Sequence, residues 1–300
     1  MGRKIEDMRI LPLLLVALGC RAQNLPVLPL TGISHVNFRV SDLDRARAFY
    51  TGLLGFPQAF TTGRNGAVGT VYLKVNDEQY IEISPGLKEG VDQRLTHVSF
   101  VTTDIEKLHA ALAARGLNPT PLRPPGGDGT RGIRITDPFG FPLEFTEYLP
   151  GSEHAKARGR FEDPRRISVH LLHAGIPVPR DQLDAALAFY RDKLGFHEFW
   201  RGGSRDGETD WINLRTPGTR GDYIELMLHS GTPTRAQLGT MEHVALEVPD
   251  MQKAYRTVLE RGAPAEKSKP KIGRNGKWQL NLYDPDGSRT ELMEPNPARQ

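Results

Sequence analysis

Apolar and polar residues alternate in a short run that recurs four times along this chain. In the first copy, HVNFRV (35–40), three apolar side chains alternate with His35, Asn37 and Arg39. Successive side chains of a strand point to opposite faces, so the run predicts a strand with one face in a core and one polar face. Similar runs, each led by a histidine, occupy 97–102, 173–178 and 243–248. We therefore expect four related strands.

A helical pattern follows each of these strands. Apolar residues then recur at spacings of three and four, which is typical of a helix with one buried side, and glycine ends the last three patterns. Shorter strand-like runs come next. In the second and fourth copies DPFG (137–140) and DPDG (284–287) suit tight turns between antiparallel strands. The repeated module is thus a strand, a helix and about three further strands.

The four modules belong to two related halves. ARAFYTGLLGF (46–56) is echoed by ALAFYRDKLGF (186–196), and YIEIS (80–84) by YIELM (223–227). Similarity that recurs at nearly the same offset indicates a tandem architecture. The prediction is an α+β protein with a first domain over 33–148, a linker over 149–167, a second domain over 168–295 and a tail over 296–300.

The polar faces of the predicted strands share histidine and glutamate. His35 precedes Glu82 by 47 residues, and His97 precedes Glu144 by the same number. A single polar strand face is usually a solvated surface, but eight such residues at matching positions favour metal binding. The predicted ligands are His35, Glu82, His97 and Glu144 in the first half, and His173, Glu225, His243 and Glu291 in the second.

This donor set suits borderline divalent cations such as Zn, Ni, Co, Fe or Mn, and two carboxylates cancel the charge of the ion. A six-coordinate ion would keep two positions for neighbouring oxygens of a small-molecule substrate. His173 is preferred to His170, which lies three residues earlier and therefore on the opposite strand face. Tyr80 and Tyr223, two residues before glutamates, are expected beside the substrate. Four histidines without repeated partners are expected at the surface: His109, His154, His197 and His229.

Residues 1–22 have the pattern of an export signal. An uncharged apolar run, ILPLLLVALG (10–19), follows a basic start. It is too short to cross a bilayer and fits the core of a secretory leader. Cleavage after Ala22 and lipid attachment to Cys20 are alternatives left open. We expect an exported protein, periplasmic or secreted, with 23–32 as a tether.

Charge and cysteine content exclude some classes of partner and of binding site. The formal net charge is only +3, and part of it lies in the predicted leader, which argues against a nucleic-acid partner. Cys20 is the only cysteine, so the rest of the chain can form neither an intramolecular disulfide nor a thiolate metal site. A homodimer is left open.

These features together resemble the vicinal oxygen chelate superfamily, which includes glyoxalase I, extradiol dioxygenases, and fosfomycin- and bleomycin-resistance proteins. The resemblance rests on the histidine-led strands, on AFY…LGF in both halves and on DPxG followed by glutamate, and it extends from 33 to about 295. It implies that βαβββ modules pair into two glyoxalase-like domains whose curled sheets form cups around a metal.

The histidine–glutamate sets most resemble those of glyoxalase I. That likeness implies a lyase or isomerase in which the metal stabilises an enediolate and a glutamate moves a proton between adjacent carbons. By their motif positions, Glu144 and Glu291 would be the catalytic residues. Arg39 matches an arginine that helps glyoxalase I hold the carboxylate of its thiol cofactor, and Asn37 shares its face, so both are expected to bind substrate.

Two other functions stay open. Extradiol dioxygenases also have four modules, although one of their halves normally keeps the ligands, and Asn281 stands where a tyrosine is expected ten residues before Glu291. The third hypothesis is a non-catalytic binding or resistance protein. Such proteins usually lack the ligand set that both halves carry here.

Overall fold

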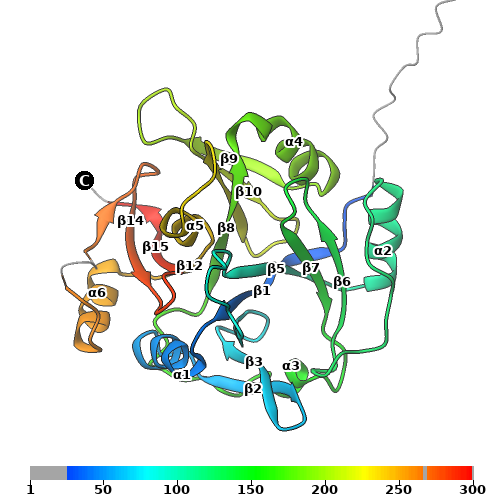
Figure 1. The fold of residues 1–300 in the computed structure, drawn as a ribbon, viewed down its shortest axis with the longest axis horizontal. Coiled ribbons are helices and arrows are strands. Elements are labelled where there is room, and N and C mark those ends of the chain that lie inside the picture. Colours follow the sequence, from blue (N-terminus) through cyan, green and yellow to red (C-terminus); the bar gives the residue numbers. More distant parts are fainter. Residues whose placement is uncertain (1–25, 266–268, 299–300) are drawn as a thin grey trace, which may run out of the picture.

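The computed structural model describes residues 26–265 and 269–298. They form two curled sheets, with α2, α4 and α6 at the periphery (Figure 1). The predicted leader and Cys20 lie outside the described residues, so export and lipid attachment stay predictions. None of the helices described is long and apolar enough to cross a membrane.

The first sheet contains the first two modules. Its strands lie in the order β2-β3-β4-β1-β5-β7-β6. At its centre β1 pairs in parallel with β4 and antiparallel with β5, which pairs in parallel with β7. The elements are β1 (Leu30–Val40), α1 (Leu43–Arg47), β2 (Gln58–Arg64), β3 (Ala67–Lys74), β4 (Tyr80–Pro85), β5 (Leu95–Thr102), α2 (Ile105–Ala114), β6 (Arg131–Thr136) and β7 (Pro142–Glu147). The second module has two strands after its helix, where about three were expected.

The second sheet repeats this arrangement with the last two modules. Its order is β13-β14-β15-β12-β8-β11-β10-β9. The short helix α3 (Glu153–Lys156) lies between the halves. The later elements are β8 (Leu171–Pro179), α4 (Leu183–Leu187), β9 (His197–Gly202), β10 (Trp211–Arg215), β11 (Tyr223–His229), α5 (Arg235–Met241), β12 (His243–Glu247), α6 (Met251–Glu260), β13 (Lys271–Ile272), β14 (Lys277–Tyr283) and β15 (Arg289–Pro297).

Aspartates begin three of the module helices. The Asp42 carboxylate accepts hydrogen bonds from the backbone N–H groups of Asp44 and Arg45, both at 3.0 Å, and Asp104 and Asp250 cap α2 and α6 in the same way. Such caps satisfy N–H groups that lack a partner within the helix. α1 and α4 continue as wider π-helical turns over 48–53 and 188–193.

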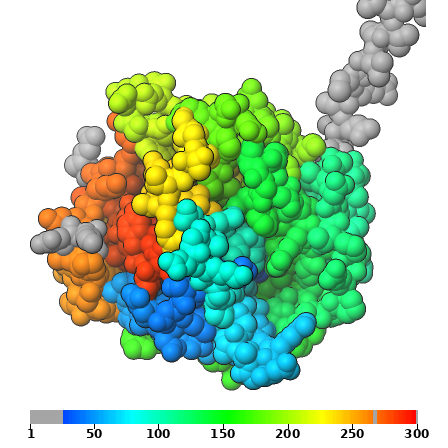
Figure 2. Space-filling view, in the orientation of Figure 1, coloured from blue at the N-terminus to red at the C-terminus, as the bar shows by residue number. Residues whose placement is uncertain are grey.

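Two motifs from different halves meet at the seam of the molecule. Tyr190 Oη donates to Asp137 Oδ2 at 2.9 Å, and Tyr50 Oη donates to Asp284 Oδ2 at 3.3 Å. The tyrosine of each AFY motif therefore contacts the DPxG aspartate of the other half. Figure 2 shows the blue first module lying against the orange and red end of the chain. The repeats predicted both motifs but not that they would contact each other.

The Tyr190 contact generates a stability prediction. The Tyr190→Phe substitution removes the phenol donor from the buried Asp137 carboxylate, which should lower the free energy of unfolding by about 1–3 kcal/mol. Tyr50→Phe should cost less because its hydrogen bond is longer. Urea unfolding measures both. Tyr255→Phe is the control, because Tyr255 is partly buried and makes no hydrogen bond to a described residue; an equal loss there would contradict the prediction.

His170 supports Asp222, a residue that joins the two halves at another point of the seam. Its Nε2 lies 2.8 Å from Asp222 Oδ1 and its Nδ1 lies 3.1 Å from Glu247 Oε2. Asp222 is fully buried, and its other oxygen accepts the backbone N–H of Ile33 at 2.8 Å. Burial opposes the charge on His170, but the carboxylates of Asp222 and Glu247 together outweigh it and raise the pKa of the imidazole.

A raised pKa in the folded state makes the stabilising effect of His170 depend on pH. The effect is fully present below the unfolded value near 6.5 and is lost as pH rises through the folded pKa. Urea unfolding of wild type and His170→Gln at pH 6 and pH 9 tests this. The difference in unfolding free energy between the two proteins should shrink at pH 9. A difference that stays constant would show that His170 acts only through packing.

Candidate metal centres

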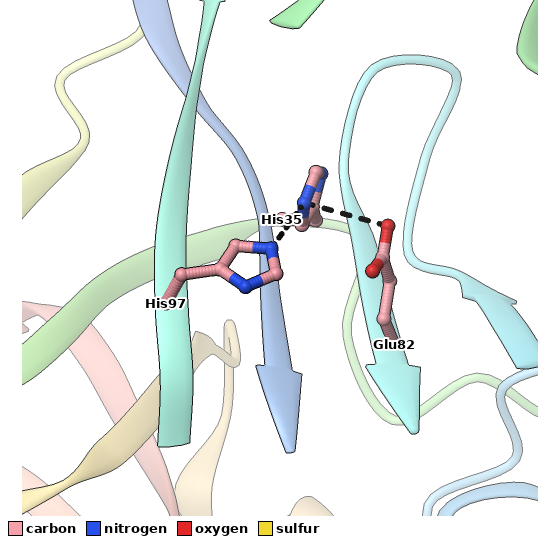
Figure 3. Close-up of side chains that lie close together, drawn as sticks. All are labelled: His35, Glu82 and His97. Atoms are coloured by element: carbon pink, nitrogen blue, oxygen red, sulfur yellow. Dashed lines mark hydrogen bonds and ion pairs between the residues drawn. The ribbon is translucent and has the colours of Figure 1, made fainter. Parts of the chain in front are cut away.

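Four neighbouring strands at the centre of the first sheet carry the four predicted ligands of the first half, which we call the first set. In order across the sheet, β4 carries Glu82, β1 carries His35, β5 carries His97 and β7 carries Glu144. Figure 3 shows His35, Glu82 and His97 approaching one another from three of these strands. Residues that are 47 positions apart thus meet because their strands are sheet neighbours.

The ligand atoms converge on one point. Nε2 of His35 lies 3.0 Å from Nε2 of His97, and 3.4 Å from a carboxylate oxygen of each of Glu82 and Glu144. Ligand atoms of His35, Glu82 and His97 all lie within 4.8 Å of one another. Atoms bound to one ion at about 2.0–2.2 Å would be separated by similar distances. These three residues therefore have the spacing of a metal site within a single chain, and Glu144 lies beside them.

A chain of hydrogen bonds, which we call a relay, determines which ring nitrogen of neutral His35 carries the proton. Tyr148 Oη donates to the carbonyl oxygen of Glu78 at 3.0 Å, so it must accept from the Ser34 hydroxyl at 2.6 Å. Ser34 Oγ must then accept from Nδ1–H of His35 at 2.9 Å. In neutral His35, the lone pair on Nε2 is consequently free to face the other ligands.

A second chain fixes His97 in the same way. The amide nitrogen of Asn37 donates to Glu82 Oε2 at 2.9 Å, and its amide oxygen accepts from the Thr96 hydroxyl at 2.8 Å. Thr96 Oγ1 then accepts from Nδ1–H of His97 at 3.1 Å. Two imidazole lone pairs on Nε2 atoms only 3.0 Å apart repel each other unless a proton or a cation lies between them. The residues present therefore fit a metal ion.

Burial and charge set the protonation of the first set. Burial lowers the pKa of His97 to about 3, so this imidazole is neutral. Burial raises the pKa of Glu82 to about 7. Burial also opposes the charge on His35, but Glu82 and Glu144 outweigh it and raise the pKa of His35. Without an ion, His35 is the group that holds a proton among the carboxylates, and metal binding would release it.

Glu144 differs from the other ligands because an arginine holds its outer oxygen. Nε and Nη2 of Arg134 each lie 2.7 Å from Glu144 Oε2, and Thr146 Oγ1 donates to Oε1 at 3.2 Å. Burial would raise the pKa of Glu144, but the hydrogen bond with His35 and the nearby positive charges hold it well below its usual range. Glu144 thus stays ionised with Oε1 directed at His35.

An open cavity of about 570 Å³ adjoins the first set. Arg39 and Arg123 lie in its lining and add positive charge, and Tyr72 adds an aromatic side chain. Tyr80, expected beside the substrate, is fully buried and is not part of the lining. Tyr223 stacks on His173, with ring centroids 4.4 Å apart. Contacts of Arg39, Asn37 and these two tyrosines with substrate stay predictions.

The expectation that His154 lies at the surface is wrong. His154 lies in α3, is 1% exposed, and packs among aromatic rings of Phe60, Tyr80 and Tyr148 at centroid distances of 4.9, 4.7 and 4.5 Å. Burial lowers its pKa to about 3. The linker folds back over the first sheet, and a lone histidine in a polar segment gave no periodic signal of this burial.

The second sheet brings the other four predicted ligands together, and we call them the second set. Nε2 of His173 lies 3.0 Å from Nε2 of His243, and Glu291 Oε2 lies 3.6 Å from both nitrogens. Glu225 Oε2 lies 3.6 Å from His243 and 4.0 Å from His173. Ligand atoms of His173, His243 and Glu291 all lie within 4.8 Å of one another. His170 lies at the seam instead.

Residues that support or crowd these sets were not predicted. Ser34 and Thr96 each directly precede a ligand histidine, Arg134 faces Glu144 across a hairpin, and Arg289 stands two residues before Glu291. The weak signal for Ser34 and Thr96 was a hydroxyl beside each histidine, which is the kind of group that orients a metal ligand. Nothing in the alternation distinguished Arg134 or Arg289 from an ordinary surface arginine.

Comparison with known proteins places this chain in a family. The model of the Glyoxalase/Bleomycin resistance protein/Dioxygenase superfamily matches residues 32–145 and 169–292. The chain belongs to this superfamily, and its two matched segments correspond to the two halves. The predicted family and paired α+β architecture are thus confirmed.

Individual relatives have several activities. The chain is 24% identical to 4-hydroxyphenylpyruvate dioxygenase of Yarrowia lipolytica over 216 residues, 62% of this chain and 54% of that protein, so it spans about half of that relative's length. It is 34% identical to ethylmalonyl-CoA/methylmalonyl-CoA epimerase of Cereibacter sphaeroides over 134 residues, 41% of this chain and 96% of the epimerase.

Solved structures share the fold over nearly the whole chain. An extradiol ring-cleaving dioxygenase from B. fuscum matches with a TM-score of 0.65 and 20% identity, covering 91% of this chain and 74% of that one. Homoprotocatechuate 2,3-dioxygenase from Brevibacterium fuscum, in complex with 3,4-dihydroxyphenylacetate, matches equally well and is covered to 82%. The superfamily match and the two compact triads together favour a divalent-metal site.

The hydroxyl of Thr96 generates a prediction about metal affinity. Thr96→Val removes the acceptor of the His97 Nδ1–H at nearly constant shape, and loss of such a partner typically weakens metal binding about 10–100-fold. Thr96→Ser keeps the hydroxyl and should bind like wild type. Competition with a chromophoric chelator measures the Zn²⁺ affinity of all three proteins. Equal Zn²⁺ affinities of Thr96→Val and Thr96→Ser would show that the hydroxyl of Thr96 does not orient His97.

Proposed function

We propose that the first set, which consists of His35, Glu82, His97 and Glu144, is the active site of a metal-dependent lyase or isomerase. It would move a proton at a carbon beside an oxygen-bearing carbon of a small molecule. The observation that carries this proposal is the position of Glu144. Its Oε1 lies 3.4 Å from His35, while Arg134 holds Oε2 at 2.7 Å. An ionised, oriented carboxylate thus lies beside the compact triad of the other three residues.

The residues of the first set divide the chemistry between them. His35, Glu82 and His97 would hold a divalent cation, which when bound would supply Lewis acidity to neighbouring substrate oxygens and so make the adjacent C–H bond more acidic. Glu144 is the general base that takes this proton at Oε1 and returns it to carbon. Arg134 keeps the carboxylate from turning away from the substrate.

Two further features support the proposal. Arg39 and Arg123 in the cavity lining favour a substrate with an anionic group. The relative that is 34% identical is named an epimerase, and an epimerase inverts one carbon centre of its substrate. Both features support proton transfer on a bound substrate over a purely structural role for the first set.

A ring-cleaving dioxygenase is the second candidate. Two histidines and one carboxylate form each compact triad, and non-haem iron oxygenases use this ligand pattern. The fold match to a ring-cleaving dioxygenase over 91% of the chain also favours it. The fourth residue, Glu144, favours the lyase or isomerase, because a three-ligand site has no need of a second ionised carboxylate.

Replacement of Glu144 tests the proposed base. Glu144→Gln keeps the shape but removes the proton acceptor, so turnover should fall about 10²–10⁴-fold. The assay follows a hemithioacetal of methylglyoxal with a small thiol, in deuterated water, by proton NMR. Glu147→Gln is the control, since Glu147 lies on the same strand outside the cavity lining.

Full turnover by Glu144→Gln would contradict the proposal, and a loss confined to Glu291→Gln would move it to the second half. Oxygen uptake by the iron-loaded protein with 3,4-dihydroxyphenylacetate, without deuterium exchange on the hemithioacetal, would select the dioxygenase instead.

A further inference from the structure

We propose that only the first set takes a metal ion, and that the guanidinium of Arg289 replaces the ion in the second set. This inference goes beyond the proposed function, because it concerns the half to which no chemistry has been assigned. The sequence predicts two equivalent sets of four ligands. The structure shows that their surroundings differ in charge and in hydrogen bonding.

Arg289 lies among the ligand atoms of the second set. It stands on β15, two residues before Glu291, so both side chains share a strand face, and it is only 8% exposed. Its Nη2 lies 2.8 Å from Nδ1 and 3.0 Å from Nε2 of His243, and 4.0 Å from Glu225 Oε2. Nearly equal distances to two ring nitrogens that point in different directions place the guanidinium over the imidazole face.

A guanidinium in this place opposes a second cation. An ion bound to His243 Nε2 would lie within a few ångströms of Nη2, and the repulsion would be weakly screened because both charges are buried. Arg289 itself supplies positive charge to the carboxylates of Glu225 and Glu291. The second set therefore has a cation built into the chain, where the first set needs one from solution.

The first set has no counterpart of Arg289. The equivalent position on β7, two residues before Glu144, is the uncharged Pro142. Arg134 does approach the first set, but only at the outer oxygen of Glu144, and its side chain is 56% exposed, against 9% for Arg289. Solvent can therefore screen Arg134 from a bound ion far better than it can screen Arg289.

The second set also lacks one of the two relays. Nδ1 of His173 is buried and has no hydrogen-bond partner among the described residues. The hydroxyl that orients His35 comes from Ser34, and the residue before His173 is Leu172. Metal-bound histidines almost always donate their other N–H to a partner. The missing partner is thus an independent reason to expect no ion at His173.

Metal stoichiometry tests the inference on the purified chain. After equilibration with Zn²⁺ and removal of the excess, wild type should retain one ion per chain, and a variant with His35→Gln and His97→Gln should retain none. Arg289→Met, which removes the charge at similar bulk, should raise the wild-type value to two and the double variant to one. Arg215→Met is the control, because Arg215 is an exposed arginine of the same half, and it should leave the value unchanged.

Several outcomes would overturn the inference. Two ions in wild type would do so, and so would one ion that is lost with His173→Gln but kept with His35→Gln. These two tests do not need Arg289→Met to fold. A folded Arg289→Met that gains no ion would also overturn it. If wild type bound no ion and Arg289→Met bound one, the role of Arg289 in the second set would stand, while the metal in the first set and the proposed function that uses it would fail, so the two failures can be told apart.

Discussion

The structure depends on one electrostatic constraint: imidazoles and carboxylates that lie close together on buried strand faces need a positive charge between them. In the first set, two imidazole nitrogens lie 3.0 Å apart and carboxylate oxygens lie 3.4 Å from one of them. Such a cluster is stable only if a positive charge is shared among its members. The sheet imposes the cluster, since the four residues stand on strands that are neighbours at its centre. A cation is the simplest way to satisfy it.

The surrounding hydroxyl and amide groups turn this cluster into an oriented site. Each relay ends at a group whose hydrogen-bonding role is fixed: a backbone carbonyl that can only accept in one, and the amide group of Asn37, which also contacts Glu82, in the other. The direction of every hydrogen bond follows from those ends, so both imidazoles present a lone pair to the centre. Because Asn37 contacts Glu82 and Thr96 together, it also links the ligands of neighbouring strands.

The two halves show that one backbone framework can support different charge balances. The corresponding four strands of each sheet carry the same four ligand types. The residue two positions before the last glutamate, however, is a proline in the first half and a buried arginine in the second. The reciprocal contacts of Tyr190 with Asp137 and of Tyr50 with Asp284 hold the halves together. The second half can therefore support the fold of the first whether or not it binds an ion.

The sequence by itself determined the modules, the two halves and the residues on each polar face, because alternation and repetition are local properties of the chain. It also placed His173, and not His170, on the face of the ligands. Only the tertiary structure decided which strands are neighbours, that AFY and DPxG pair across the halves, that His154 is buried, and that Arg134 and Arg289 approach the ligands differently. Those features depend on contacts between side chains distant in sequence, and whether a charged group lies in solvent or beside another charge cannot be derived from its spacing along the chain.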